Sequence, residues 1–114
     1  MKVDLLTREY PPHVYGGAGV HVDELSQVLA SRIDVTVRAF DGPRSPSERS
    51  GEDGPLPSLD VQGYDVPKEL SDANTVLKTF SVDLLMARDV DADLVHAHTW
   101  YTCLAGRLAA QLHD

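Results

Sequence analysis

A cluster of glycines and a pair of histidines are the residues of this chain whose types and spacing could do chemistry. Gly16, Gly17 and Gly19 lie in the stretch Y-P-P-H-V-Y-G-G-A-G-V-H-V-D-E, between a short apolar segment and an amphipathic one. A glycine turn at a strand-to-helix junction lets backbone amides approach an anion, because no Cβ stands in the way. The three glycines therefore indicate a phosphate-bearing ligand, although close packing alone would also explain them.

The histidines His96 and His98 form the second candidate, in the motif H-A-H-T-W-Y. Both side chains of a strand with this spacing point to the same face. We expect His98 at the carboxyl end of the strand, where open α/β sheets bind ligands, and His96 one pleat deeper as a buried residue. No Cys, Asp or Glu is placed to complete a metal-ligand set, so we expect neither metal nor cofactor.

The other candidates for chemistry are weaker. Cys103 is the only cysteine, which excludes an intramolecular disulfide. It falls in a predicted helix without a basic partner nearby, and this favours a buried structural thiol over a nucleophile. His13, His21 and His113 have no supporting context.

The composition excludes two classes of partner. The 114 residues carry 18 acidic and 10 basic side chains, for a formal charge of −8, and no basic stripe occurs. Nucleic-acid surfaces need clustered Lys and Arg, so we expect no nucleic-acid partner. The apolar runs are too short to span a membrane, so we expect a cytoplasmic protein without a membrane partner.

The elements that must position these residues follow from the apolar periodicity. Predicted strands cover residues 2–7, 33–40, 59–64 and 94–98, and predicted helices cover 18–31, 73–88 and 100–111. This order is typical of an α/β protein with a Rossmann-like parallel sheet flanked by helices. Leu77, Phe80, Leu84 and Ala87 predict the buried stripe of the second helix, and Thr99 is placed to cap the third.

The first and fourth strands carry the two candidate motifs at their carboxyl ends. If these strands are neighbours, as in a Rossmann order, Gly17 and His98 meet at one rim of the sheet. Residues 41–58 hold four Pro, three Gly and four Ser, and predict a flexible loop within one domain of residues 1–114.

The two motifs also resemble a known family. The segments T-R-E-Y-P-P-x-V-Y-G-G-A-G-V-H-V-x-E-L and D-L-V-H-A-H-T-W-Y-T-x-L-A-G resemble bacterial glycogen synthases. The closer likeness is to the form that uses an ADP-glucose donor and is also described as an α-maltose-1-phosphate synthase. The resemblance covers nearly the whole chain except residues 41–58. It implies a retaining glycosyltransferase of the two-Rossmann-domain (GT-B) architecture, acting on an α-glucan or glucose 1-phosphate acceptor.

The resemblance also implies roles for individual residues. Gly16 and Gly17 match the glycine loop that approaches the donor diphosphate and the acceptor, with Gly19 in the same loop. His98 matches the histidine beside the donor sugar, where its contacts help to stabilise an oxocarbenium-like transition state. Tyr15 replaces the lysine that many bacterial glycogen synthases carry before the glycines, which favours the α-maltose-1-phosphate synthase subgroup.

The family's carboxyl-terminal Rossmann domain, which holds most of the nucleotide contacts, has no counterpart in these 114 residues. We therefore expect the amino-terminal part of a truncated enzyme, inactive alone, whose partners are the missing domain, the nucleotide-sugar donor and the acceptor. Two alternatives remain open. One is a stand-alone, non-catalytic α/β module that binds a phosphate or small molecule, and the other is a related glycosyltransferase with a different acceptor.

Overall fold

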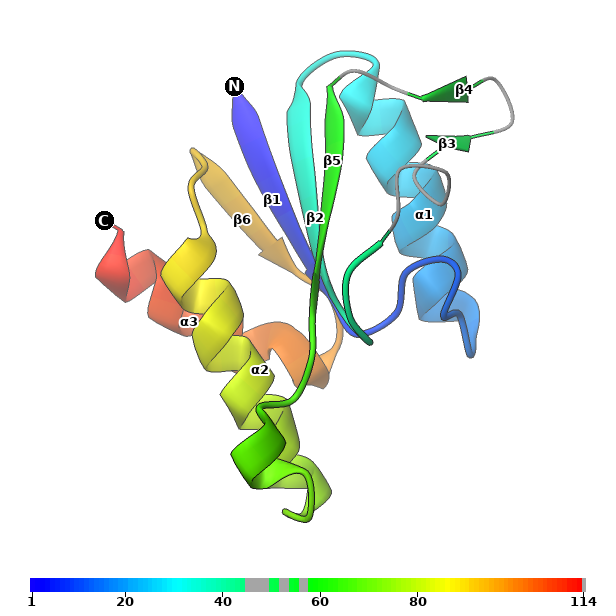
Figure 1. The fold of residues 1–114 in the computed structure, drawn as a ribbon. Helices are drawn as coiled ribbons and strands as arrows, with labels where there is room; N and C mark the ends of the chain where they lie inside the picture. Colours follow the sequence, from blue (N-terminus) through cyan, green and yellow to red (C-terminus); the bar gives the residue numbers. More distant parts are fainter. Residues whose placement is uncertain (45–49, 52–53, 56–57, 114) are drawn as a thin grey trace.

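A four-stranded parallel sheet with helices on both faces forms the chain, in the strand order β5–β2–β1–β6 (Figure 1). The computed structural model describes residues 1–44, 50–51, 54–55 and 58–113. The strands are β1 (Lys2–Thr7), β2 (Asp34–Phe40), β5 (Leu59–Tyr64) and β6 (Leu94–Ala97). The helix α1 (Gly17–Ala30) covers one face, and α2 (Thr75–Asp89) and α3 (Cys103–Leu112) cover the other. The predicted α/β parallel sheet flanked by helices is confirmed.

The first strand, β1, lies between β2 and β6 and is buried along almost its whole length, as its apolar sequence predicts. Alternate side chains divide between two cores, because successive residues of a strand point to opposite faces. Leu5 packs toward α1 with Val22 and Val37, whereas Leu6 packs toward α2 and α3. The predicted contact between the first and fourth strands is confirmed by the parallel pairing of β1 with β6.

A buried polar chain crosses the sheet and was not predicted from the sequence. Arg38 Nε lies 2.8 Å from Asp4 Oδ2, and its Nη1 donates to the hydroxyl of Tyr64 at 2.9 Å. That hydroxyl donates to Asp89 Oδ2 at 3.0 Å. These bonds link β1, β2 and β5 to the end of α2, so they fix the helix against the sheet. Pairing also offsets the cost of burying the charges of Asp4 and Arg38.

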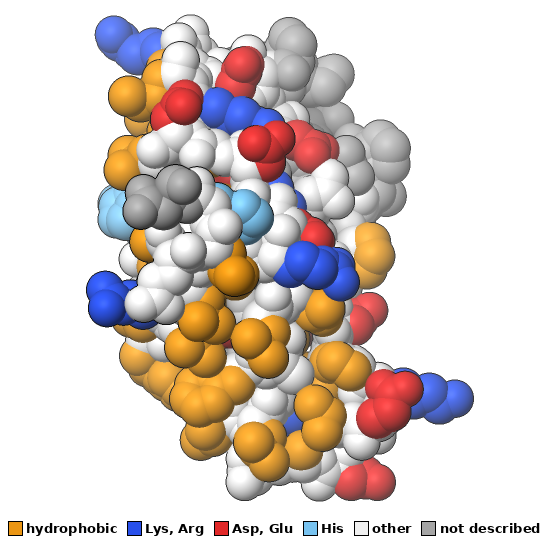
Figure 2. Space-filling view, turned by 90° about the vertical axis from the view of Figure 1, so that its left-hand side faces the viewer, with side chains coloured by type: hydrophobic (Ala, Val, Ile, Leu, Met, Phe, Trp, Pro, Cys, Tyr) orange, Lys and Arg blue, Asp and Glu red, His pale blue; other side chains and the backbone are white. Residues whose placement is uncertain are grey.

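The helix α2 turns a different face to the sheet from the one predicted. Its sheet-facing and interhelical residues are Thr79, Ser81, Val82, Asp83, Met86 and Ala87. The predicted stripe is wrong in three of its four members, because Leu77, Phe80 and Leu84 are 51%, 41% and 58% exposed. Figure 2 shows hydrophobic side chains gathered on this surface of the molecule. The side chain of Asn74 caps the helix by accepting from the amide of Leu77 at 2.9 Å.

The last helix begins later than predicted. A 3₁₀ turn, Trp100–Thr102, precedes α3, and Thr99 makes no capping hydrogen bond with its side chain, so its predicted capping role is wrong. Cys103, the first residue of α3, is exposed, which also corrects the expectation of a buried thiol. The buried carboxyl of Asp83 faces this end of α3, and burial raises its pKa to about 7, partly offset by the backbone amide of Ala105.

The segment 41–58 lies partly outside the described residues, so its predicted flexibility stays a prediction. Within it, β3 (Ser50–Gly51) and β4 (Gly54–Pro55) pair antiparallel. Gly63 of β5 packs against the turn after β2, where a Cβ would lie 1.6 Å from the carbonyl oxygen of Gly42. Among the described helices, none has the length and apolar character needed to cross a membrane.

Candidate functional site

Two adjoining hollows lie at the carboxyl ends of the strands, the edge at which open α/β sheets bind ligands. The first has a volume of about 400 Å³ and is formed by the loops that follow β1 and β6. Its lining residues are Thr7, Arg8, Glu9, Tyr15, Gly16, Ala18, Thr99 and Tyr101. Gly16 and the residue after His98 therefore share one hollow. The two motifs therefore meet at one rim of the sheet through these neighbouring residues, whereas Gly17 and His98 themselves do not line this hollow.

The glycines of the first loop differ in what surrounds them. A Cβ at Gly16 or Gly17 would meet no atom within 4 Å, so these positions are open to a ligand. A Cβ at Gly19 would lie 2.9 Å from Val14 Cγ1, and packing therefore explains this glycine without a ligand. Helix α1 has no capping side chain and no acidic residue in its first turn. Its amides and its dipole can accordingly favour an anion at the hollow.

His98 follows β6 directly and is held by the backbone, since its amide donates to the carbonyl of Leu6 at 2.9 Å. Its ring centroid lies 4.1 Å from that of His96 and 5.9 Å from that of His21 on α1. Burial, followed by the charges of His96 and His21, lowers the pKa of His98 to about 4. The imidazole is therefore neutral near pH 7, and its Nε2 is buried without a hydrogen-bond partner among the described residues.

Two expectations about the other histidines are wrong. His96 is exposed rather than buried, because β6 is an edge strand in the described sheet. His21, which had no supporting context in the sequence, lies beside His98. His21 lies one turn after Gly17 on the helix that follows β1, and this spacing could have indicated its place near the site. Within the described ranges, no three His, Cys, Asp or Glu side chains lie close enough to hold a metal ion.

The turn after His98 is strained and anchored. Thr99 has φ of +67°, a left-handed conformation that costs a non-glycine residue about 1–3 kcal/mol. The hydroxyl of Thr102 lies 2.8 Å from the carbonyl oxygen of His98 and 3.2 Å from that of Leu6. This hydroxyl ties the turn to β1 and β6 and so positions His98. Sequence reasoning missed Thr102, because a threonine beside a helix start first indicates a cap.

Arg8 separates the first hollow from a second one and was also missed. Its Nη1 donates to Asp41 Oδ2 at 2.7 Å, and its guanidinium carbon lies 4.9 Å from the centroid of Phe40 and 6.0 Å from that of Tyr101. Tyr15, the residue before the glycines, extends its hydroxyl to within 3.4 Å of the same carboxylate oxygen. The loop after β1 is thus fixed to the loop after β2.

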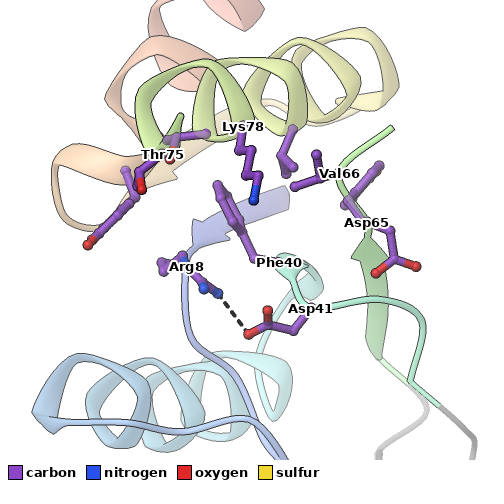
Figure 3. A pocket seen from close by; sticks show the side chains of 11 residues that line it. Arg8, Phe40, Asp41, Asp65, Val66, Thr75 and Lys78 are labelled. Carbon is purple, nitrogen blue, oxygen red and sulfur yellow. Dashed lines mark hydrogen bonds and ion pairs between the residues drawn. The ribbon is translucent and has the colours of Figure 1, made fainter. Parts of the chain in front are cut away.

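The second hollow lies beneath α2 and has a volume of about 530 Å³ (Figure 3). Its residues come from the ends of β1, β2 and β5, from α2 and from the turn before α3. They are Arg8, Phe40, Asp41, Tyr64, Asp65, Val66, Thr75, Lys78, Thr79, Val82 and Tyr101. Arg8 and Tyr101 line both hollows, so the two adjoin at these side chains.

Comparisons with known proteins identify the family that this chain matches. The family described as Glycosyltransferase Family 4 matches residues 15–114. The chain is 45% identical over 115 residues to the α-maltose-1-phosphate synthase of Mycobacterium tuberculosis strain H37Rv, covering 100% of this chain and 26% of that protein. It is 42% identical over 114 residues to the α-maltose-1-phosphate synthase of Mycolicibacterium smegmatis, covering 99% and 26%. The chain therefore spans about a quarter of the length of these curated relatives.

Proposed function

Because this chain belongs to glycosyltransferase family 4, we propose that it forms the acceptor-side part of a retaining hexosyltransferase of the glycogen synthase type. The resemblance seen in the two motifs is confirmed at the level of the family and its α-maltose-1-phosphate synthases. The proposed reaction transfers glucose from ADP-glucose to an α-glucan or to glucose 1-phosphate. The observation that carries it is the shared hollow of the glycine loop and the turn after His98.

In this proposal the donor's diphosphate approaches Gly16 and Gly17. Both positions leave room for a ligand, and the uncapped first turn of α1 offers backbone amides. Amides that are already oriented need no reorganisation when charge develops on the leaving group. Gly19 keeps its implied place in this loop through packing against Val14, which lets the first turn of α1 lie close to the loop before it.

His98 is the proposed catalytic residue beside the donor sugar. A neutral imidazole can orient a sugar hydroxyl without adding a positive charge next to a developing oxocarbenium ion. Because Nε2 is buried, a ligand can contact this atom only after a small movement of the neighbouring histidine rings. The other ring nitrogen, Nδ1, makes no hydrogen bond within the described residues. Closure of the site around the donor could supply that movement, as it does in many enzymes.

The proposal is tested by a chimera in which this chain replaces the matching quarter of the M. tuberculosis relative. We expect the chimera to transfer glucose from ADP-glucose, and the His98→Ala variant to lose about 100-fold or more in kcat, as for loss of one transition-state contact. His96→Ala is the matched control, because His96 is an exposed histidine on the same strand. It should retain most of the activity.

Two other outcomes decide between the alternatives. A chimera that melts like the relative but forms no product favours the non-catalytic binding module. A chimera that consumes ADP-glucose only with another acceptor favours the related transferase. Full activity of the folded His98→Ala chimera removes the catalytic assignment of His98.

A further inference from the structure

The carboxyl group of Asp83 on α2 takes no part in either hollow. Its side chain is fully buried, and neither oxygen has a hydrogen-bond partner among the residues that the structure describes. Asp4 is buried to the same extent, but its carboxylate forms an ion pair with Arg38. Nearly all buried polar groups of folded proteins are paired, so the buried carboxyl of Asp83 requires a physical explanation.

The first turn of α3, which lies beside α2, has no cap of its own (Figure 1). The first amides of a helix have no partner within the helix, and the side chain at its start usually supplies one. Thr102 stands at that position, but its hydroxyl bonds to the carbonyl oxygens of His98 and Leu6 instead. The amide of Ala105 in this turn favours the charged form of Asp83. Asp83 therefore occupies the place of a cap that comes from the neighbouring helix.

The two protonation states of Asp83 interact differently with α3. A carboxylate accepts hydrogen bonds from helix amides and is attracted by the positive end of the helix dipole, whereas a protonated carboxyl loses most of this attraction. Burial raises the pKa of Asp83 from 3.8 to about 7, so the group changes its charge near neutral pH. The folded chain holds this proton more tightly than the unfolded chain, so the buried carboxyl costs stability as the pH rises from 3.8 toward 7.

The charged groups around α2 do not account for this behaviour. Helix α2 packs against α3, against the turn Trp100–Thr102 and against β5. On the two helices the other titratable side chains are Lys78, Arg88, Asp89, Cys103 and Arg107. The turn adds Tyr101, β5 adds Asp60 and Tyr64, and His113 follows α3. None of them is a cause of the raised pKa of Asp83.

We infer that Asp83 is a positioning residue, which caps α3 from α2 and sets the place of Thr102 and His98 according to whether its carboxyl is charged. Ala105 follows Thr102 by three residues, so a shift of the first turn of α3 also moves Thr102. Thr102 passes this shift to His98, because its hydroxyl lies 2.8 Å from the carbonyl oxygen of His98. The effect on glucose transfer rests on the proposed function, whereas the contact between the helices does not.

The first test is an NMR titration of the isotope-labelled 114-residue chain between about pH 5 and pH 9. We expect the side-chain carboxyl carbon of Asp83 to titrate with a midpoint near pH 7. The backbone amides of Ala105, Thr102 and His98 should shift with the same midpoint. This measurement needs no variant, so a midpoint near 3.8 for Asp83, or amides that do not follow its titration, overturns the inference.

The second test uses Asp83→Asn, which keeps the size of the side chain but cannot ionise. The shifts of the Thr102 and His98 amides near pH 7 should be lost in this variant. The matched control is Asp72→Asn, which removes a carboxylate from an exposed position before α2 and should keep these shifts. Thermal melts establish that both variants are folded. A step near pH 7 that persists in the folded Asp83→Asn variant belongs to another group and overturns the inference.

The third test measures catalysis in the chimera with the M. tuberculosis relative. The ratio of kcat between the wild-type chimera and its Asp83→Asn variant should change between about pH 6 and pH 8, on the order of tenfold, because small displacements of catalytic groups alter rates strongly. A ratio that stays constant removes the positioning role, even where the amides follow Asp83. A chimera without activity contradicts the proposed function instead, and the NMR titration still decides whether Asp83 controls the turn.

Discussion

The charge of His98 depends on its burial and on two neighbouring histidine rings. Its ring contacts His96 and lies edge-on to His21, and burial is the largest cause of its lowered pKa. The pKa of His98 in the folded chain is about 4, below its ordinary value of 6.5. The stabilising contribution of the neutral ring is therefore present above pH 6.5 and is lost as the pH falls through about 4.

We predict that the imidazole of His98 titrates with a midpoint near pH 4 in an NMR titration of the folded chain. His96→Gln should raise this midpoint, because it removes the second-largest cause of the shift. The control is His113→Gln, since His113 lies at the end of α3 against the carbonyl of Ala87. A midpoint near 6.5 for His98 in the folded chain contradicts the prediction.

At the scale of residues, the sequence indicates candidate residues through their type and their place at a strand end. It does not indicate residues whose role depends on contacts with distant segments. Glycines at one strand end and a histidine at another follow from local order, so the places of Gly16, Gly17 and His98 in the fold could be predicted, and their roles stay predictions. The role of Thr102 depends on carbonyl groups of two strands, one of them 96 residues away in sequence. No local pattern carries that information.

At the scale of elements, α2 explains why an apolar period can indicate the wrong face. A helical period is followed by the exposed residues Leu77, Phe80 and Leu84. The buried set, which contains Thr79, Val82 and Met86, follows a helical period as well. The buried set includes polar residues, because α2 borders a hollow at one end and α3 along its side. Apolar spacing alone therefore could not choose between the two faces.

Substitution by alanine should have different effects on stability at Gly63 and at Gly17. A Cβ at Gly63 would meet backbone atoms of the turn after β2, which cannot move as a side chain can. We predict that Gly63→Ala lowers the free energy of unfolding by about 3 kcal/mol or more. Gly17→Ala should change it by no more than about 1 kcal/mol, because the added methyl group enters open space and alanine favours a helix.

Denaturant unfolding of the two variants measures this difference, with the wild type as the reference. In the chimera with the M. tuberculosis relative, the bulkier Gly17→Val should in addition reduce transfer, since its side chain would enter the open space in which we propose that the ligand binds. Equal stability losses for Gly63→Ala and Gly17→Ala would show that the close approach of Gly42 to Gly63 relaxes at little cost.

At the scale of the whole molecule, the sheet order is what makes one site from distant segments. The alternation of strands and helices predicted a parallel sheet, and a Rossmann order placed β1 next to β6. Of the observed order β5–β2–β1–β6, only this adjacency was predicted. The polar chain from Asp4 through Arg38 to Asp89 follows from side-chain geometry across three strands, and the alternation of strand residues did not indicate it.

The last prediction is that the 114-residue chain alone forms no measurable product from ADP-glucose. Retaining transfer requires the diphosphate to be held and neutralised while positive charge develops on the sugar, and one missing donor can cost about 10²–10³ in rate. The chain spans 26% of its relatives and carries a formal charge of −8. In the first hollow its cation, Arg8, is already paired with Asp41.

A product assay on the isolated chain and the chimera, with thermal melts of both, measures this. Appreciable ADP-glucose-dependent transfer by the isolated chain would overturn the view that a further domain must hold the donor.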